Sequence, residues 1–250
     1  MQPVNFLLLQ PDELDAQGHA VLRGRRAEHV RTVLRAEVGA ILRAGVVGGA
    51  LGTATVHEVT PERVVVQAVL QQLPAAADDV LLLAVPRPKV LLGMYAHAAS
   101  LGFGRIVLCR TWRVDKSHLQ SNALRQDVAT EQLLLGLEQA GRTRIPEILF
   151  FPLFKPMVED ALPGLGLPAL RFVGHPAAAT ATADLAPLAR APFALAIGPD
   201  GGFLPYEVDA LAARGFVPVS AGTHALRTET ALAVLTGQLD LLRARGSLAP

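Results

Sequence analysis

The stretch that most constrains the fold lies near the C-terminal end, where an apolar run stops at a cluster of glycines. Residues 193–197 are apolar throughout, and Gly198-Pro199-Asp200-Gly201-Gly202 follow directly. Three glycines and a proline within five residues cannot continue a strand, because this backbone must adopt positive φ or approach another group closely. The sequence therefore predicts a strand that ends in a tight loop, with a helix beginning at Pro205.

The same arrangement occurs again a little further along the chain. A second strand is expected at residues 216–219, followed by a glycine turn at Gly222 and by residues 226–231, which lead into another helix. In open α/β sheets, ligands bind at the carboxyl ends of strands, in such loops. The two loops therefore predict a ligand site, and a tight turn without a ligand is the alternative interpretation of their glycines.

Strands and helices alternate through residues 80–250, which predicts a parallel α/β domain of about six strands. The continuous apolar run at residues 80–85 is typical of a parallel strand covered on both faces. Residues 176–190 are rich in Ala, Pro and Thr and are expected to form a loop with one weak helical turn. Further strands are expected at 105–108, 147–151 and 170–173, and helices at 89–101, 121–140 and 155–161.

The N-terminal part follows a different pattern. Short strands separated by turn residues predict a small β-barrel. Residues 71–79 are a short linker, so two domains are expected, at 1–72 and 78–250. The barrel strands are expected at 4–9, 40–47, 52–59 and 63–70, with one helix at 23–38 that presents Val30, Val33, Leu34 and Val38 on one face and ends at Gly39.

Composition limits the class of protein. The 250 residues are 51% hydrophobic and 18% charged, which is typical of a compact globular chain. The apolar runs are too short to span a membrane, and the N-terminus lacks the basic region of a signal peptide. We therefore expect a cytoplasmic protein with no membrane partner. The single cysteine, Cys109, follows an apolar strand and is expected to be a buried structural thiol.

Several common site motifs are absent from the sequence. It contains no G-x-x-x-x-G-K-[ST], no G-x-S-x-G, and no G-x-G-x-x-G after the strand at residues 80–85. The seven histidines show no H-E-x-x-H or H-x-x-x-H pairing, so no metal site is expected. What remains is a ligand site whose glycine loops follow the last strands of the α/β domain in sequence, whereas a Rossmann site would follow the first strand.

The basic residues are unevenly distributed, although the net charge is only +1. Lysine accounts for only three of the 23 basic residues, and arginine matches phosphate geometry and stacks on bases. Ordinary surface charge in an arginine-rich composition is the alternative interpretation. Trp112, between Arg110 and Arg113, is a candidate for stacking on a base, or else a half-buried structural residue.

Motifs along nearly the whole chain resemble one family. Residues 197–203 (IGPDGGF), Glu207, Gly222 and 226–231 (LRTETA) resemble the closing signature of the SPOUT-class RNA methyltransferases. The sequence is most similar to the small-subunit rRNA methyltransferase E family, which makes N3-methyluridine in 16S rRNA. Upstream, residues 138–147 (EQAGRTRIPE) resemble the family element EQ-x-GR-x-x-x-PE. His175-Pro176 and the helix residues Arg26, His29, Val33, Leu34 and Arg35 also fit family positions.

The resemblance implies a fold and a cofactor. The fold would be a PUA-like β-barrel followed by a SPOUT parallel-sheet domain with a deep trefoil knot. Three loops at the knot would bind S-adenosylmethionine in a bent conformation, mostly through backbone groups, and no metal is implied. The implied cofactor-binding residues are Val173, Gly174, His175, Ile197, Gly198, Pro199, Gly201, Gly202, Ser220, Gly222, Leu226, Thr228 and Ala231.

The resemblance also implies catalytic residues. Arg227 is hypothesised to orient a substrate phosphate or to polarise a uracil carbonyl. Loss of the weakly acidic N3 proton requires a stabiliser or a base, for which Glu229 and Asp200 are candidates. Thr228 is a possible N-cap of the last helix, and Glu229 suits the first helical turn whatever its role.

The implied partners are 16S rRNA or the small ribosomal subunit, and a second copy of the chain in a homodimer. A methyltransferase of the same class with another target, in 23S rRNA or tRNA, remains an alternative, as does a catalytically silent rRNA-binding assembly factor. For His29, a histidine satisfied within the fold is as good an interpretation as RNA contact. The candidate RNA-binding residues are Arg25, Arg26, His29, Arg35, Arg142 and Arg144.

Overall fold

The computed structural model describes residues 6–246, which fall into two compact units. The first unit combines Met1–Ala76 with Leu134–Ile145, and the second combines Ala77–Leu133 with Pro146–Pro250. The boundary at Ala76 lies within the linker expected at residues 71–79. The chain returns to the first unit once, so that residues 134–145 belong to it and not to the unit that precedes and follows them in sequence.

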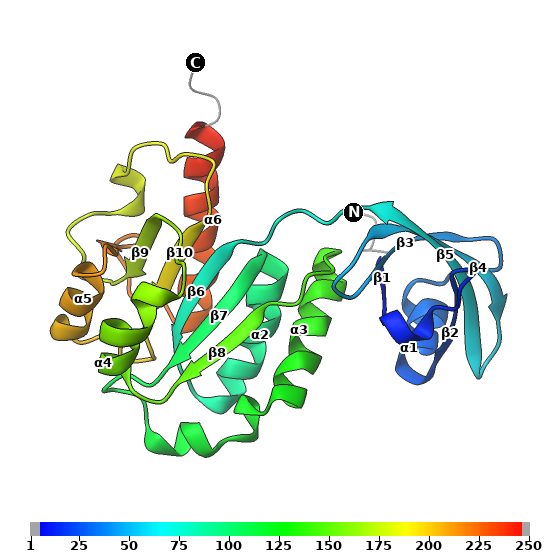
Figure 1. Ribbon diagram of the computed structural model, residues 1–250, viewed down its shortest axis with the longest axis horizontal. Helices are drawn as coiled ribbons and strands as arrows, with labels where there is room; N and C mark the ends of the chain where they lie inside the picture. Colours follow the sequence, from blue (N-terminus) through cyan, green and yellow to red (C-terminus); the bar gives the residue numbers. More distant parts are fainter. Residues whose placement is uncertain (1–5, 247–250) are drawn as a thin grey trace. The chain divides into compact units, whose positions relative to one another are not determined.

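The first unit is built on a mainly antiparallel sheet (Figure 1). Its described strands have the order β1-β3-β4-β5-β2, and only the β1–β3 pair is parallel. Four of them were expected, although residues 4 and 5 of the first lie outside the described residues. β2 was not expected, and its last residue, Arg23, was assigned to the helix expected at residues 23–38. The strands are β1 (Phe6–Leu9), β2 (His19–Arg23), β3 (Ile41–Val46), β4 (Leu51–Val59) and β5 (Arg63–Gln72).

The helix expected at residues 23–38 is much shorter in the structure. α1 (Gly24–Glu28) continues as one π-helical turn, His29–Val33, and the helix ends there. Arg35 adopts a φ of 48°, which cannot continue a helix, and Val33 is 56% exposed. The expected apolar face is therefore wrong for Val33 and Val38, which are exposed, whereas Val30 is buried and Leu34 packs against the core. Gly39, expected as the helix terminator, instead lies in the turn before β3 and has a φ of 88°.

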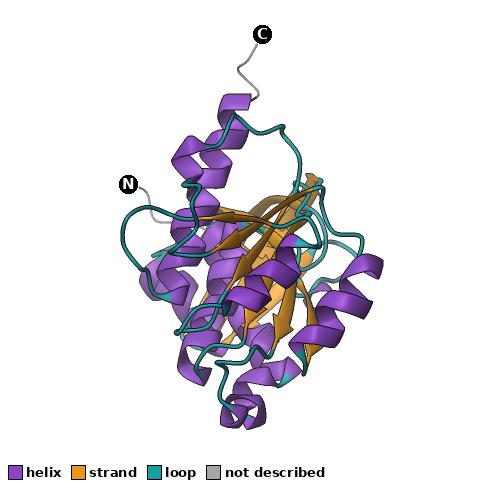
Figure 2. Cartoon of the chain, turned by 90° about the vertical axis from the view of Figure 1, so that its left-hand side faces the viewer, coloured by secondary structure: helices purple, strands orange, loops and turns teal. Residues whose placement is uncertain are grey.

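The second unit contains a parallel six-stranded sheet, as the alternation of strands and helices predicts. The described strand order is β11-β9-β10-β6-β7-β8, with helices on both sides of the sheet (Figure 2). None of the helices within residues 6–246 combines the length and apolar character that a membrane crossing requires. The strands are β6 (Asp79–Ala84), β7 (Phe103–Cys109), β8 (Glu147–Phe151), β9 (Leu170–Gly174), β10 (Phe193–Ile197) and β11 (Val217–Val219).

The helices of this unit lie close to the expected positions. The helix expected at 121–140 begins at Gln126, because the residues before it form 3₁₀ turns. Two helices, α2 and α6, pack against each other beside the sheet. The helices are α2 (Pro88–Leu101), α3 (Gln126–Ala140), α4 (Phe154–Pro156) with a π-helical turn to Ala161, α5 (Pro205–Ala212) and α6 (Thr228–Gly246). The part of α3 from Leu134 onward belongs to the first unit.

The core of the second unit is formed by β6 and β10, whose apolar side chains are almost fully buried. Cys109, at the end of β7, is 1% exposed, which confirms the expected buried thiol. Burial, and next the negative charge of Glu207, raise the pKa of this thiol to about 12. A thiol of this kind is a poor nucleophile, so Cys109 serves packing.

One charged cluster ties the last helix to the start of the central strands. Arg243 on α6 binds both carboxylate oxygens of Asp79, with distances of 2.9 Å from Nη1 to Oδ1 and 3.0 Å from Nη2 to Oδ2. Asp79 Oδ1 also accepts the backbone N–H of Phe193 at 2.8 Å. The Arg243 guanidinium lies 4.5 Å from the centre of the Phe193 ring. These contacts fix α6 against β6 and β10.

We predict that Arg243→Ala lowers the free energy of unfolding by about 2–3 kcal/mol, because it leaves a mostly buried carboxylate without its cation. Urea denaturation followed by circular dichroism measures this difference. Arg125→Ala is the matched control, since the Arg125–Asp127 pair is 61% and 64% exposed and should contribute little. Equal effects of the two substitutions would contradict the role given to Arg243.

Candidate functional site

Three loops meet at the carboxyl ends of β9, β10 and β11, which are neighbours in the sheet although far apart in sequence. Between the loops lies a cavity of about 190 Å³. We call it the loop cavity. It is lined by Gly174, His175, Pro176, Ile197, Pro199, Asp200, the glycines 198, 201 and 202, Ala221, His224, Ala225, Leu226, Thr228, Ala231 and Leu235.

Ten of the thirteen residues expected to bind a cofactor line the loop cavity. Val173 does not, because its side chain is fully buried within β9. Ser220 instead pairs with the segment Thr180–Thr182, and Gly222 lies in the third loop without lining the cavity. Sequence reasoning missed six wall residues, although four of them adjoin expected ones and Leu235 lies one helical turn after Ala231. Those missed are Pro176, Asp200, Ala221, His224, Ala225 and Leu235.

The glycines between β10 and α5 are required by the loop itself. A Cβ on Gly198 would lie 2.9 Å from the backbone nitrogen of Phe203, and one on Gly201 would lie 2.9 Å from Cδ of Arg113. Gly202 has a φ of 71°, which favours glycine regardless of space. The loop is therefore held in one conformation by its own packing and is shaped before any ligand arrives.

Two arginines from other strand ends hold this loop. Arg87, which follows β6, forms an ion pair with Asp200, with 2.7 Å between Nε and Oδ2. Arg113, which follows β7, donates from Nη1 to the carbonyl of Gly201. The carboxylate of Asp200 is thus engaged by a cation, which makes it a weaker candidate for the base than a free carboxylate.

Thr228 joins the second loop to the third. Its side chain is buried, and its hydroxyl donates to the carbonyl of Gly198 over 3.5 Å. α6 begins at Thr228, so the position before the helix belongs to Arg227, and the expectation that Thr228 is the N-cap is wrong. On the same helix, Gln238 donates to the carbonyl of Ala221 at 3.0 Å. α6 therefore holds the second loop through Thr228 and only the beginning of the third loop through Gln238.

Glu207 on α5 is fully buried and fixes the neighbouring backbone. Its Oε2 accepts the N–H of Leu204 at 2.8 Å, within the first turn of the helix. Its Oε1 accepts the N–H of Trp112 at 2.8 Å, from the segment that follows β7. One carboxylate thereby connects the start of α5 to the end of β7.

Arg227 and Glu229, the expected catalytic residues, lie beside the loop cavity but do not line it. Arg227 is exposed and follows Leu226, whereas Glu229 is half-buried and lies in the first turn of α6. Within residues 6–246 neither side chain forms a hydrogen bond or an ion pair. Both are therefore free to meet a substrate.

The six candidate RNA-binding residues all belong to the first unit. Arg26 is held by the structure, since it pairs with Glu13 and donates to the carbonyl of Leu8 at 2.6 Å. Arg25 is largely exposed and lies 3.7 Å from Glu138, and Arg35 is exposed. His29 is half-buried, and Arg142 and Arg144 flank Thr143, whose buried hydroxyl donates to the carbonyl of Gly49 at 2.8 Å.

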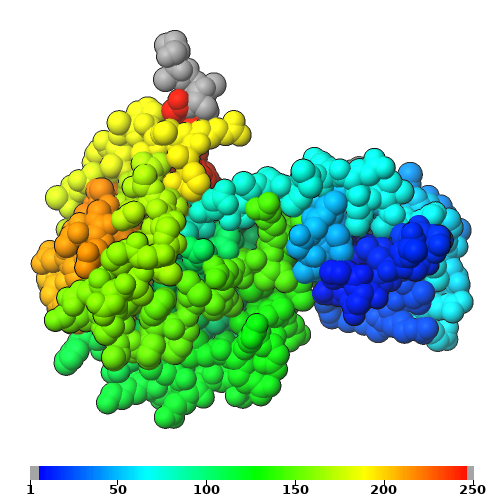
Figure 3. All heavy atoms as spheres, in the orientation of Figure 1, coloured from blue at the N-terminus to red at the C-terminus, as the bar shows by residue number. Residues whose placement is uncertain are grey.

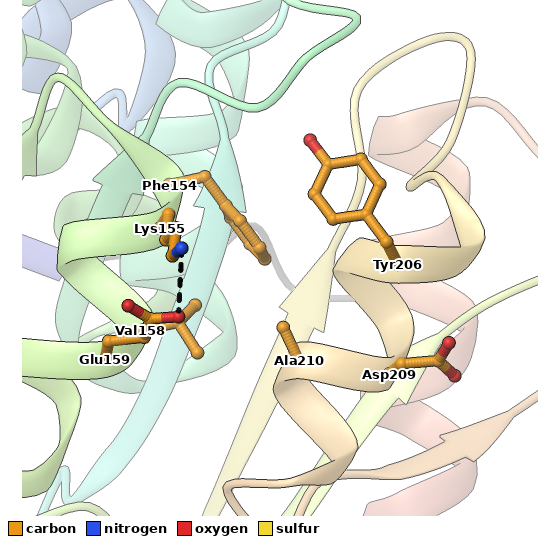
Figure 4. Close-up of a pocket in the computed structure, with 7 residues that line it drawn as sticks. All are labelled: Phe154, Lys155, Val158, Glu159, Tyr206, Asp209 and Ala210. Atoms are coloured by element: carbon orange, nitrogen blue, oxygen red, sulfur yellow. Dashed lines mark ion pairs between the residues drawn. The ribbon is translucent and has the colours of Figure 1, made fainter.

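A second, larger cavity of about 430 Å³ lies between α5 and the helical segment that contains α4 (Figure 4). These two segments lie side by side on the face shown in Figure 3, with α5 in orange. Phe154 and Tyr206 stand on opposite walls. Its charged residues are Lys155, which pairs with Glu159, and Asp209. Two carboxylates against one ammonium make this groove a poor site for a phosphate.

Comparison with known proteins agrees with the geometry. The family model for an RNA methyltransferase domain matches residues 74–240. Ribosomal RNA small subunit methyltransferase E of Treponema pallidum (strain Nichols) is 31% identical over 236 residues, which cover 91% of this chain and 87% of the relative. In Mycobacterium tuberculosis (strain CDC 1551 / Oshkosh), the protein of that name is 34% identical over 111 residues, which cover 43% of this chain and 41% of the relative.

Solved structures are also similar over nearly the whole chain. A methyltransferase from Legionella pneumophila, in complex with the bound cofactor SAM, has a TM-score of 0.67 and 27% identity, with 96% of this chain and 97% of the other covered. Ribosomal RNA small subunit methyltransferase E of Neisseria gonorrhoeae, bound to S-adenosyl methionine, has a TM-score of 0.68 at 18% identity, again covering 96% and 97%. Because the Neisseria gonorrhoeae protein is only 18% identical to this chain, its similarity shows the fold alone.

The family expected from the sequence motifs is thus confirmed by a match that covers most of the chain. The chain belongs to the RNA methyltransferase family that includes ribosomal RNA small subunit methyltransferase E.

Proposed function

We propose that the chain transfers a methyl group from S-adenosylmethionine to N3 of a uridine in 16S rRNA. The observation that carries this proposal is the convergence of three loops on one cavity in a chain of this family. The relative from Treponema pallidum carries the name of a small-subunit rRNA methyltransferase, and the similar structure from Legionella pneumophila contains SAM. The RNA target and the uridine position are part of the proposal.

The loop cavity suits a cofactor recognised mainly through backbone. Nine of its sixteen wall residues are glycine, alanine or proline, and apolar side chains come from Ile197, Leu226 and Leu235. Its polar wall residues are His175, Asp200, His224 and Thr228. Small residues leave backbone N–H and C=O groups accessible to the adenine, the ribose and the amino-acid part of the ligand. The residues that would hold the cofactor are Gly174, His175, Ile197, Gly198, Pro199, Gly201, Gly202, Leu226, Thr228 and Ala231, and when bound it supplies an activated methyl group.

Part of the site is expected to move when the cofactor binds. The cavity of about 190 Å³ is smaller than a usual small-molecule site of roughly 300 Å³ or more. The third loop is exposed from Gly222 to Arg227, while the loop at Gly198–Gly202 is fixed by Arg87 and Arg113. The third loop would therefore move outward to admit the ligand, and Arg227 would move with it.

Arg227 is the group best placed to act on the substrate. Its neighbours Leu226 and Thr228 line the loop cavity, and its own guanidinium has no partner within residues 6–246. A guanidinium at this rim can stabilise the negative charge that develops on a uracil carbonyl as N3 loses its proton. Glu229, two residues later and also free within the described chain, is the candidate acceptor for that proton.

The first unit is proposed to dock the RNA. It would be the PUA-like domain, with residues 1–72 at its centre, and the methyltransferase domain would span 78–250. The described structure places Arg142 and Arg144 in the same unit as Arg25 and Arg35, which supports one continuous basic surface. Arg26 is better explained as a structural residue, because its guanidinium is already used by Glu13 and Leu8.

We also propose the deep trefoil knot and a homodimer. Ser220, just after β11, donates to the carbonyl of Thr180 at 2.9 Å, and its own carbonyl accepts the N–H of Thr182. β11 pairs with β9 on its other side, and residues 175–192 connect β9 to β10. The end of β11 thus lies between β9 and the connection at residues 175–192, which comes earlier in the sequence. This arrangement supports a chain that is threaded through a loop.

The proposed homodimer can be tested by sedimentation velocity. A monomer in that experiment would contradict the proposal.

The proposed reaction predicts a defined product. Purified protein, incubated with S-adenosylmethionine and small ribosomal subunits from cells that lack the gene, should add N3-methyluridine to 16S rRNA. Mass spectrometry of the released nucleosides measures this product. Methylation of 23S rRNA or tRNA in parallel reactions would reassign the substrate, and no methylation in any of them would contradict the proposed activity.

Arg227→Ala should lower methyl transfer by about 100-fold or more, because the charge that stabilises the developing anion is removed. Binding of S-adenosylmethionine, measured by calorimetry, should change by no more than about twofold, because Arg227 lies outside the cavity wall. Arg190→Ala, which alters an exposed arginine between β9 and β10, is the control and should retain activity. Full activity of the Arg227 variant would exclude this role.

A further inference from the structure

Trp112 is the only tryptophan of the chain, and its side chain is 76% exposed. Large aromatic residues are normally mostly buried, and those left open to solvent often belong to binding surfaces. The alternative interpretation of Trp112 as a half-buried structural residue is therefore wrong. An exposed indole at this place needs another explanation.

The backbone of Trp112 is anchored by a hydrogen bond to a buried side chain. Its N–H donates to Oε1 of the fully buried Glu207 at 2.8 Å, and the other oxygen of Glu207 holds the N–H of Leu204. The indole is thus presented from an anchored position beside the start of α5. A rigid aromatic surface loses little conformational entropy when a ligand stacks on it.

The surroundings of Trp112 are basic and adjoin the proposed cofactor site. The next residue, Arg113, donates to the carbonyl of Gly201, which lines the loop cavity. Arg87 reaches the same loop through Asp200. On the other side of Trp112, Arg110 has a buried Nε without a hydrogen-bond partner among residues 6–246. Arginines on the segment that presents an exposed aromatic ring suit a ligand that combines phosphates with flat bases.

We propose that Trp112 stacks on an unpaired base of the substrate RNA and so positions the strand beside the loop cavity. The proposal rests on the proposed function. N3 of uracil lies on the Watson–Crick edge, so a uridine can be methylated there only when it is unpaired. Enzymes that act on such bases take them out of the stack and hold the exposed bases against aromatic or apolar side chains.

The single tryptophan allows a direct test, because all indole emission of the native protein reports on Trp112. An unstructured oligouridylate should quench the emission in a saturable manner when it is added to the full-length protein. Heparin, a polyanion without bases, should bind the arginines but leave the emission almost unchanged. Anisotropy of a labelled oligouridylate measures RNA binding independently. If it shows saturable binding while the tryptophan emission does not change, the proposal is overturned.

Variants separate stacking from a structural role. Trp112→Ala should weaken oligouridylate binding by about tenfold, whereas Trp112→Phe, which keeps a stacking ring, should stay within about threefold. Leu153→Ala, which removes an exposed apolar side chain after β8, should bind RNA like the native protein. Circular dichroism should show all three folded. Native-like RNA binding by Trp112→Ala, or equal losses in the Ala and Phe variants, would overturn the proposal.

The proposal and the methyltransferase function can fail separately. Quenching by oligouridylate without methyl transfer to any RNA would refute the function and leave the stacking site standing. Methyl transfer with an unchanged KM for RNA in Trp112→Ala would refute the stacking site and leave the function standing. A second copy of the chain is the other possible partner of the indole. In that case tryptophan emission would depend on protein concentration without RNA, and Trp112→Ala would lose the dimer. These two results together would overturn the proposal.

Discussion

The site depends on the parallel register of three strands. Ile197 of β10 and Val219 of β11 both pair with Gly174 of β9, so the three strands end at the same level of the sheet. Strand ends that are more than twenty residues apart in sequence, together with the loops that follow them, are thereby brought to one edge. α6 then closes this edge, because Thr228 contacts Gly198 and the Asp79–Arg243 cluster fixes the far end of the helix.

The three loops differ in how firmly the protein holds them. The loop after β10 is shaped by its own backbone and by two arginines from the neighbouring strand ends, whereas the loop after β11 is exposed from Gly222 to Arg227. The loop after β10 thus offers a preformed binding surface. The loop after β11, which carries Arg227, is the part that we propose moves when a ligand enters.

Much of the fold and part of the site follow from sequence, for identifiable reasons. Continuous apolar strands and glycines at strand ends are local signals, so the six parallel strands and the glycine loops were predicted. The ten cavity residues were predicted through the resemblance to family motifs. The contacts Arg87–Asp200 and Trp112–Glu207 were not, because they join residues about 100 positions apart and leave no periodic pattern. The shortened helix after β2 also escaped, since valines at helical spacing look alike whether buried or exposed.

The central claim is that the loops after β9, β10 and β11 form one S-adenosylmethionine site. Calorimetric titration of the native protein and of Ala231→Phe tests it most directly, because Ala231 lies on α6 and lines the loop cavity, so that a larger side chain there reduces the space for a ligand. The account predicts one binding event per chain for the native protein and binding weakened by at least about tenfold in the variant, with unchanged thermal stability. Equal binding by both proteins, or none by the native one, would contradict it.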